Sequence, residues 1–254
     1  MSNLDNKEKE FAQVLADITK HARRQGGTVT EDEIRDAFEN LELSDAQYEL
    51  IYDYLKKHNI GIGETIDSSE YLSEEESGYL SEYLEELSMI ETVSDGEKEA
   101  IIISAMAGET DAQKKLAEIS LSMVADVAKL YAEQGVLIED LIGEGNIALM
   151  KAVGDLSNLE DHKECDAFLA QMVMDAMENL IEDDAAETAR AQKAVKLVQE
   201  VADKAKELAD ELRRSCTVDE LAEETGWDRA KILEAIKACG NQIEDIDYKP
   251  EKKE

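Results

Sequence analysis

Residues 131–153, YAEQGVLIEDLIGEGNIALMKAV, are the stretch from which the rest of the chain is best interpreted. Its apolar residues recur every three or four positions, which is the spacing of one face of an α-helix. Three polar residues, Asp140, Glu144 and Asn146, are interspersed among them. We expect an amphipathic helix whose core side includes Leu149 and Met150. The full apolar set is Leu137, Leu141, Ile142, Leu149, Met150 and Val153.

The same helical spacing recurs on the N-terminal side of this stretch. Three short amphipathic segments between residues 11 and 63 predict a small, acidic three-helix bundle. Residues 64–78, ETIDSSEYLSEEESG, are acidic and rich in Ser, and we interpret them as a mobile linker. A larger helical unit follows over residues 79–190, and a polar stretch at 155–164 separates its last two helices.

Further helices are predicted towards the C-terminus. A long helix opens the unit at residues 191–245. The segment 217–238, TVDELAEETGWDRAKILEAIKA, then has the form of helix, tight turn at Gly226 and helix, which is typical of a helix-turn-helix. Residues 246–254 form a charged tail.

The sequence also marks where several helices begin. A Ser or Thr followed three residues later by Glu or Gln forms a capping box, in which the two side chains accept hydrogen bonds from each other's backbone N–H groups. Each pair predicts a helix start. The five pairs are Thr30/Glu33, Ser44/Gln47, Ser94/Glu97, Thr110/Gln113 and Thr217/Glu220.

The composition favours an all-α fold, with a small N-terminal bundle and a larger helical bundle that ends in the helix-turn-helix-like unit. Among 254 residues the single proline is Pro250, so long helices can form without interruption. Aromatic residues make up only 5% of the chain, which argues against a β-sandwich or barrel.

The net charge limits the choice of partner. The chain has 61 acidic and 27 basic residues, for a formal net charge of −34. Affinity for DNA comes largely from Lys and Arg contacts to phosphate, so this surface should repel a bare duplex. It suits a basic protein partner or a nucleic-acid mimic. Solubility alone is an equally good explanation of the excess charge.

Several function classes lack any supporting pattern. The chain has no apolar run of about 18 residues and no signal peptide, so we expect no membrane association. Its three cysteines are far apart, which is typical of reduced thiols in a cytoplasmic protein. We expect no metal site, no cofactor and no enzymatic activity, because no cluster of residue types stands out from the many carboxylates.

Residues 131–153 closely resemble the core-binding signature of the sigma-70 family of bacterial RNA polymerase sigma factors. That signature is a tyrosine followed by a run of D-L-I-Q-E-G-N-x-G-L-x-K-A-V. Gly143 replaces the usual glutamine and Ala148 the usual glycine. The residues that match in register are Asp140, Leu141, Ile142, Glu144, Gly145, Asn146, Leu149, Lys151, Ala152 and Val153.

The resemblance implies a partner and a site. The partner is core RNA polymerase, bound at a coiled coil of its largest subunit. The N-terminal bundle resembles the acidic domain of housekeeping sigma factors, which mimics DNA in that family. Residues 191–245 resemble the third conserved region, and we expect the fourth, which reads the upstream promoter element, to be missing. The implied polymerase-binding residues are Asp140, Glu144, Asn146 and Lys151.

The chain departs from the family at residues 165–190, where the family's helix melts promoter DNA. That activity needs aromatic faces for flipped bases and basic residues for the backbone. Gln171 and Met172 stand where the family has two tryptophans, and Met174 where it has an arginine. From Glu164 to Arg190 there are eight acids and one base, a net charge of −7. The remaining weak DNA-contact candidates are Phe168, Arg213, Arg214, Arg229 and Lys231.

Three functional hypotheses follow. In the first, a sigma-like protein docks on polymerase and modulates initiation, with its promoter-melting residues largely lost. In the second, a divergent sigma factor directs promoter-specific initiation. In the third, an acidic helical interaction module keeps only the fold and does not bind polymerase. The intact signature favours the first two, and the acidic helix favours the first over the second. A regulatory protein partner is compatible with all three, and DNA would bind only weakly or within a polymerase complex.

Overall fold

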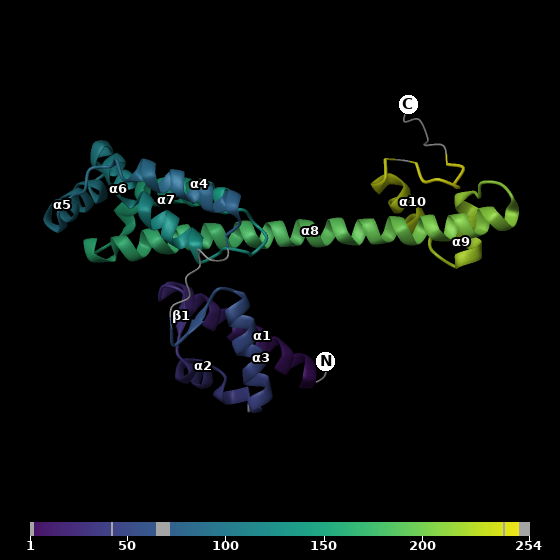
Figure 1. Ribbon diagram of the computed structural model, residues 1–254, viewed down its shortest axis with the longest axis horizontal. Coiled ribbons are helices and arrows are strands. Elements are labelled where there is room, and N and C mark those ends of the chain that lie inside the picture. Colours follow the sequence, from purple (N-terminus) through teal and green to yellow (C-terminus); the bar gives the residue numbers. More distant parts are fainter. Residues whose placement is uncertain (1–2, 42, 65–71, 241, 249–254) are drawn as a thin grey trace. The chain divides into compact units, whose positions relative to one another are not determined.

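The computed structural model describes residues 3–41, 43–64, 72–240 and 242–248, and its elements are predominantly helical (Figure 1). The chain divides into two compact units, Met1–Glu182 and Asp183–Glu254. The predominance of helices confirms the expected all-α class. The helices are α1 (Asn3–Arg24), α2 (Glu31–Ala37), α3 (Asp45–Lys57), α4 (Glu74–Leu87), α5 (Asp95–Met106), α6 (Thr110–Lys129), α7 (Ile138–Gly154), α8 (Cys165–Leu212), α9 (Val218–Thr225) and α10 (Arg229–Ala238).

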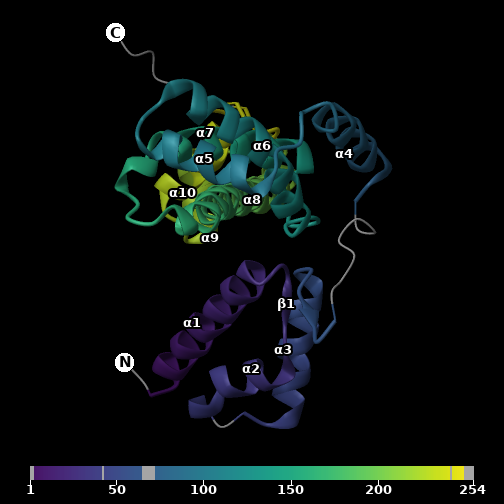
Figure 2. The same cartoon turned by 90° about the vertical axis from the view of Figure 1, so that its left-hand side faces the viewer.

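The N-terminal bundle consists of α1, α2 and α3, which enclose a common core (Figure 2). Phe38 is fully buried in this core, and its ring centroid lies 5.4 Å from that of Phe11. Two strands that the sequence pattern did not predict, β1 (Thr28–Val29) and β2 (Gly61–Ile62), pair in parallel beside the helices. They are only two residues long, too short for any period-two pattern to be recognised.

Within the first unit, the bundle contacts the helices that follow it. Arg23 of α1 is only 7% exposed, and its guanidinium lies 4.3 Å from the ring centroid of Tyr131. It also forms an ion pair with Glu178 at 3.4 Å and donates a hydrogen bond to Gln134 at 2.8 Å. The side-chain amide of Asn59 donates to the backbone carbonyl of Ala132 at 2.6 Å. The N-terminal bundle is thus joined to the helices that follow it by polar contacts as well as by the chain itself.

Helix α4 begins inside the stretch that we expected to be linker. Its N-cap is Ser73, which forms a capping box with Glu76. Glu76 also accepts a hydrogen bond from the backbone N–H of Ile138 at 3.1 Å, which joins the start of α4 to the start of α7. A sequence rich in Ser and Glu thus starts a helix here, because those residue types satisfy the first N–H groups. Residues 65–71 of the expected linker lie outside the described residues.

Four of the five expected capping boxes are present, at the starts of α2, α3, α5 and α9. The fifth prediction, Thr110/Gln113, is wrong in detail. Helix α6 has Glu109 as its N-cap, so Thr110 is already its first helical residue. The side chain of Gln113 instead donates to the backbone carbonyl of Ala105 at the end of α5.

The main core of the first unit lies where α6, α7 and α8 pack together. Gly145 sits at the closest approach: a Cβ atom there would lie 2.5 Å from Met177 Cε and 2.7 Å from Val124 Cγ1. Real Cβ atoms essentially never come this close to another atom. A glycine is therefore required at this point of α7 by the neighbouring helices.

Helix α8 is a single helix of 48 residues, where the sequence had suggested two successive helices. The expected boundary at residues 190 and 191 lies inside it. No proline or glycine interrupts α8 between Cys165 and Leu212, so nothing in the backbone forces a break. The domain boundaries themselves stay a prediction.

The second unit combines the C-terminal part of α8 with α9 and α10 around its own core. The helix-turn-helix-like form is present. Gly226 ends α9 in the left-handed conformation, with φ of 68°, and Asp228 caps the N-terminus of α10. Only glycine adopts this conformation at no steric cost, so the turn depends on it.

We predict that Gly145→Ala destabilises the protein, by about 1–3 kcal/mol, because the stiff side chain of Val124 cannot move aside without strain. The matched control is Gly143→Ala on the same helix, where a Cβ atom meets nothing within 4 Å. That change should stabilise by up to about 1 kcal/mol through helix propensity. Denaturant unfolding of the two variants measures both effects. Equal behaviour of the variants would contradict the packing argument.

Candidate functional site

The outward side of α7 carries apolar residues that are exposed to solvent. Leu137 at its N-cap is 51% exposed, Ile147 49% and Met150 71%. Exposed apolar residues in such spacing mark a surface that can bind another protein. Our expectation that Met150 belongs to the core was wrong, because α7 buries its opposite side, including Leu149, against α6 and α8.

Polar residues share this outward side. Asp140 and Lys151 are exposed and Glu144 is half-buried. Positions 140, 144, 147 and 151 follow one another at intervals of three and four, so they form one continuous stripe along the helix. We call this stripe, together with Leu137 and Met150, the α7 face. Three of the four predicted polymerase-binding residues thus lie together on one accessible surface.

The fourth predicted residue, Asn146, has a different environment. It is half-buried, and its side-chain oxygen accepts a hydrogen bond from the hydroxyl of Tyr83 on α4 at 3.2 Å. This contact orients α4 against α7. Asn146 therefore has an internal structural partner at the edge of the α7 face.

The N-terminal part of α8 has no exposed pair of aromatic rings among its described residues. Phe168 is half-buried and packs against the core of the first unit. Gln171 donates a hydrogen bond to Asp175 at 2.6 Å, one turn further along. Met172 packs on the core and Met174 is 9% exposed. The residues that replace the family's tryptophans and arginine are thus used in packing and in local hydrogen bonds.

Three of the four basic DNA-contact candidates make internal ion pairs. Arg214 forms two hydrogen bonds with the carboxylate of Glu220, at 3.0 and 2.6 Å. Arg229 pairs with Asp219 at 3.3 Å. An internal carboxylate competes with DNA phosphate for each of these guanidinium groups.

The other two basic candidates differ from each other. Lys231 pairs with Glu200 at 3.4 Å, and its ammonium lies 3.9 Å from the centroid of the Trp227 ring. Arg213 is exposed and adopts a left-handed backbone conformation, with φ of 57°, directly after the end of α8. Arg213 makes no ion pair with any described residue, so it is the more accessible of the two.

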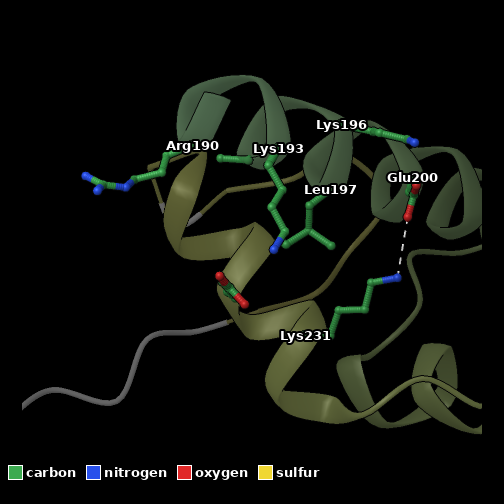
Figure 3. Close-up of a pocket in the computed structure, with 8 residues that line it drawn as sticks. Arg190, Lys193, Lys196, Leu197, Glu200 and Lys231 are labelled. Carbon is green, nitrogen blue, oxygen red and sulfur yellow. Dashed lines mark hydrogen bonds and ion pairs between the residues drawn. The ribbon is translucent and has the colours of Figure 1, made fainter. Parts of the chain in front are cut away.

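The structure also contains a basic groove that the sequence interpretation missed. It has a volume of about 620 Å³, and α8 and α10 of the second unit line it (Figure 3). Figure 3 shows Lys193 and Leu197 projecting from α8 toward α10 and Arg190 pointing outward at one end. We use the name basic groove for the surface lined by Arg190, Lys193, Lys196, Leu197, Glu200 and Lys231, together with Ala194 and Glu234.

A charge pattern in the sequence marks one wall of this groove, the one that α8 supplies. Arg190, Lys193 and Lys196 follow one another at intervals of three, directly after the acidic segment of α8. Residues at this spacing lie on one side of a helix. From Arg190 to Lys206 there are five basic and two acidic residues, so the sign of the charge reverses along α8. This change lies at the C-terminal end of residues 165–190, the segment on which the sequence-based prediction of DNA contacts rested.

The described residues include no candidate for a membrane span or for a metal site. No helix in this part of the chain is long and apolar enough to span a membrane. In the same residues, no three His, Cys, Asp or Glu side chains are placed to hold one metal ion.

The fold thus defines an all-α protein with a mixed apolar and polar helix face. Residues 9–87, which extend from α1 to the end of α4, match the family model for sigma-70 factor, region 1.1. This match covers the N-terminal bundle, and the resemblance noted above for that bundle is confirmed.

The chain is similar to three curated sigma factors. Over 232 residues it is 27% identical to the RNA polymerase sigma factor SigA of Clostridium acetobutylicum, covering 87% of this chain and 61% of that protein. It is 28% identical over 161 residues to the SigA proteins of a Bacillus species and of Listeria monocytogenes, covering 63% of this chain and 42% and 43% of those proteins. The chain thus spans less than two thirds of the length of these relatives. Together with the region 1.1 match, these similarities support a sigma-70 family factor.

We predict that the Glu220 carboxyl titrates with a pKa of about 2, because Arg214 and the backbone N–H of Thr217 donate hydrogen bonds to its charged form. Arg214→Gln should raise this pKa toward the ordinary value of 4.5. Since the folded value lies below the ordinary one, the stabilisation is present at neutral pH and is lost as the pH falls from 4.5 to about 2. Carboxyl NMR titration measures the shift, and Arg213→Gln is the control that should leave it unchanged. An equal shift in both variants would show that the ion pair is not its cause.

We predict no appreciable affinity of the isolated chain for duplex DNA at physiological salt. Specific DNA-binding proteins rely on several phosphate contacts helped by counterion release. Here the helix expected to touch DNA has a net charge of −7 over residues 164–190, and Arg214 and Arg229 are paired internally. Anisotropy titrations with duplex and forked promoter fragments test this. Micromolar or tighter binding that weakens steeply with salt would instead support a working sigma factor.

Proposed function

We propose that the chain binds core RNA polymerase through the α7 face and modulates transcription initiation in the cytoplasm. The observation that carries this proposal is the α7 face itself, where Ile147 and Met150 are exposed beside Asp140, Glu144 and Lys151. The same residues lie within the stretch that resembles the family's core-binding signature. The similarity to sigma-70 family factors supports the choice of polymerase as partner.

The chemistry of the α7 face suits a partner that is both apolar and basic. Burial of an exposed apolar side chain such as Ile147 or Met150 contributes about 1.5–3 kcal/mol to the free energy of binding. Carboxylates at the rim of such a contact set its orientation and favour a basic surface. The coiled coil of the polymerase's largest subunit is the surface that the resemblance implies. Asp140, Glu144 and Lys151 would face the coiled coil directly. Asn146 would contact it from the edge of the α7 face while its side-chain oxygen keeps the hydrogen bond from Tyr83.

The interior of the first unit keeps this face rigid. The opposite side of α7 is buried through Leu141, Ile142 and Leu149, which are fully inaccessible to solvent. The backbone N–H of Ile138 is bound by Glu76 of α4. A preorganised helix loses little conformational entropy when it binds, which supports specific docking.

The described residues of α8 fit a role in modulating transcription initiation better than a role in opening promoter DNA. Opening needs stacking surfaces and phosphate contacts, and Phe168, Met172 and Met174 pack inward here. We propose that the N-terminal bundle acts as a DNA mimic, as the resemblance implies, and that a regulatory protein can join the complex. A divergent sigma factor that directs initiation is the second candidate, and the cations of the basic groove are the observation that favours it.

We predict that Glu144→Lys and Met150→Glu each weaken co-purification with core polymerase by at least about tenfold. The first reverses a charge that faces the basic partner, and the second puts a charge where the contact is apolar. Both positions are accessible, so the far-ultraviolet circular dichroism should not change. Glu223→Lys is the matched control, since it makes the same charge change on an exposed site of α9.

Retained binding by both α7 variants would contradict the assignment of the site. A loss that Glu223→Lys reproduces would show that total charge, and not the α7 face, controls the interaction. Competition by a housekeeping sigma factor gives an independent readout, because two proteins that use one surface of the polymerase exclude each other.

A further inference from the structure

The basic groove holds cations that the rest of the chain does not neutralise. Acidic residues outnumber basic ones by 61 to 27, so carboxylates are abundant as potential ion-pair partners. Yet Arg190, Lys193 and Lys196 are exposed and make no ion pair with any residue of the described ranges. Pairing with internal carboxylates, which occupies Arg214 and Arg229 elsewhere in the second unit, does not occur at these three positions among the described residues.

The opposite wall of the groove fixes a fourth cation. Lys231 of α10 is held by its ion pair with Glu200 and by the Trp227 ring. Figure 3 shows this ion pair beside Lys193 and Leu197. The side chain of Lys231 is thus held in place before a ligand arrives, which reduces the entropy that binding must remove.

The size and the lining of the groove suit a compact anion. Its volume of about 620 Å³ falls within the range of about 300–1,000 Å³ that is usual for small-molecule sites. Leu197 and Ala194 supply an apolar surface, and the cations surround it. Phosphate groups are the anions that several closely spaced Lys and Arg side chains bind best, because each oxygen accepts a charge-assisted hydrogen bond.

A long polyanion that extends beyond the groove is repelled by the acidic residues that precede Arg190, whereas a compact anion can avoid them. The acidic segment of α8 ends at Glu187, which lies about 4.5 Å along the helix axis from Arg190. This distance is shorter than the screening length of about 8 Å at physiological salt. From Glu164 to Ala189 that segment has eight acids and no base. A duplex that extends beyond the groove is therefore repelled, whereas a ligand confined to the groove meets mainly its cations.

We propose that the basic groove binds a compact polyphosphate, either an inorganic chain or the triphosphate of a nucleotide. Lys193 and Lys196 contact the phosphates from α8, Lys231 contacts them from α10, and Arg190 closes one end. Glu200 acts as a positioning residue through Lys231. This site lies in the second unit and does not depend on the polymerase contact proposed for α7.

Calorimetric titration of the full chain in physiological salt, without divalent cations, tests the proposal. Tripolyphosphate is the first probe, and ATP and GTP are the second. Equal affinity for all three identifies the phosphates as the whole recognised group, and tighter nucleotide binding shows that the base also contacts the groove. Both results support the proposal, and absence of binding by all three up to millimolar concentration overturns it.

Matched variants assign the binding to the groove. Lys193→Gln with Lys196→Gln should weaken binding by at least about tenfold, since each lost charge-assisted hydrogen bond contributes roughly that factor. Lys204→Gln with Lys206→Gln removes the same charge from the same helix outside the groove, and should have little effect. Equal losses of affinity in the two double variants would overturn the assignment of binding to the basic groove.

A variant that gains affinity is needed as well, because a loss of binding could also result from misfolding. Glu234 lines the groove and repels an anion, so Glu234→Gln should strengthen tripolyphosphate binding several-fold. No gain would contradict the proposed location. Single-stranded and duplex oligonucleotides form the last arm. Binding at least ten times tighter than that of tripolyphosphate, lost in the Lys193 and Lys196 variant, would show a nucleic-acid surface and overturn the compact-ligand proposal.

Discussion

The close packing of α7 against α6 and α8 is the constraint on which the rest of the first unit depends. At Gly145 the neighbouring side chains leave no room for a Cβ atom, so the rotation of α7 about its axis is fixed. That rotation decides which residues face solvent. Leu149 is buried in the core, whereas Met150, one residue later, is turned outward. The proposed interaction surface is therefore a consequence of interior packing, and a small change inside the core would alter it without touching any exposed residue.

Electrostatics divides the basic residues into two groups. In a chain with a net charge of −34, some Lys and Arg side chains of the described residues pair with carboxylates and others do not. Arg23, Arg214 and Arg229 form ion pairs that hold elements together. The exposed pairs of Arg214 and Arg229 contribute little to stability, but they do occupy the cation. Among the cations that make no ion pair with any described residue, Arg190, Lys193 and Lys196 gather at the basic groove.

The sequence predicted the helical class, the three-helix bundle, the turn at Gly226 and most helix starts, because these depend on local spacing and on short-range hydrogen bonds. It also identified α7 as the informative helix. It did not predict that Met150 is exposed, since an apolar residue next to Leu149 fits a core equally well until the neighbouring helices are known. The pairing of β1 with β2 and the groove between α8 and α10 join residues that are distant in sequence, so no local pattern could reveal them. The reversal of charge at Arg190 was visible in the sequence, but its meaning depends on Lys231 lying opposite.

Helix α8 carries its acidic and its basic segment in series, with no residue that breaks the helix between them. Within the second unit, Asp183, Asp184 and Glu187 precede Arg190, Lys193 and Lys196, so opposite charges lie next to each other on one helix and form a local electric dipole. Such a dipole helps to orient the unit in the field of a charged partner before the two surfaces touch. The helix would thus influence the speed of encounter and the angle of approach more than the final affinity. Its effect should be strongest at low ionic strength, where the field of the partner reaches furthest.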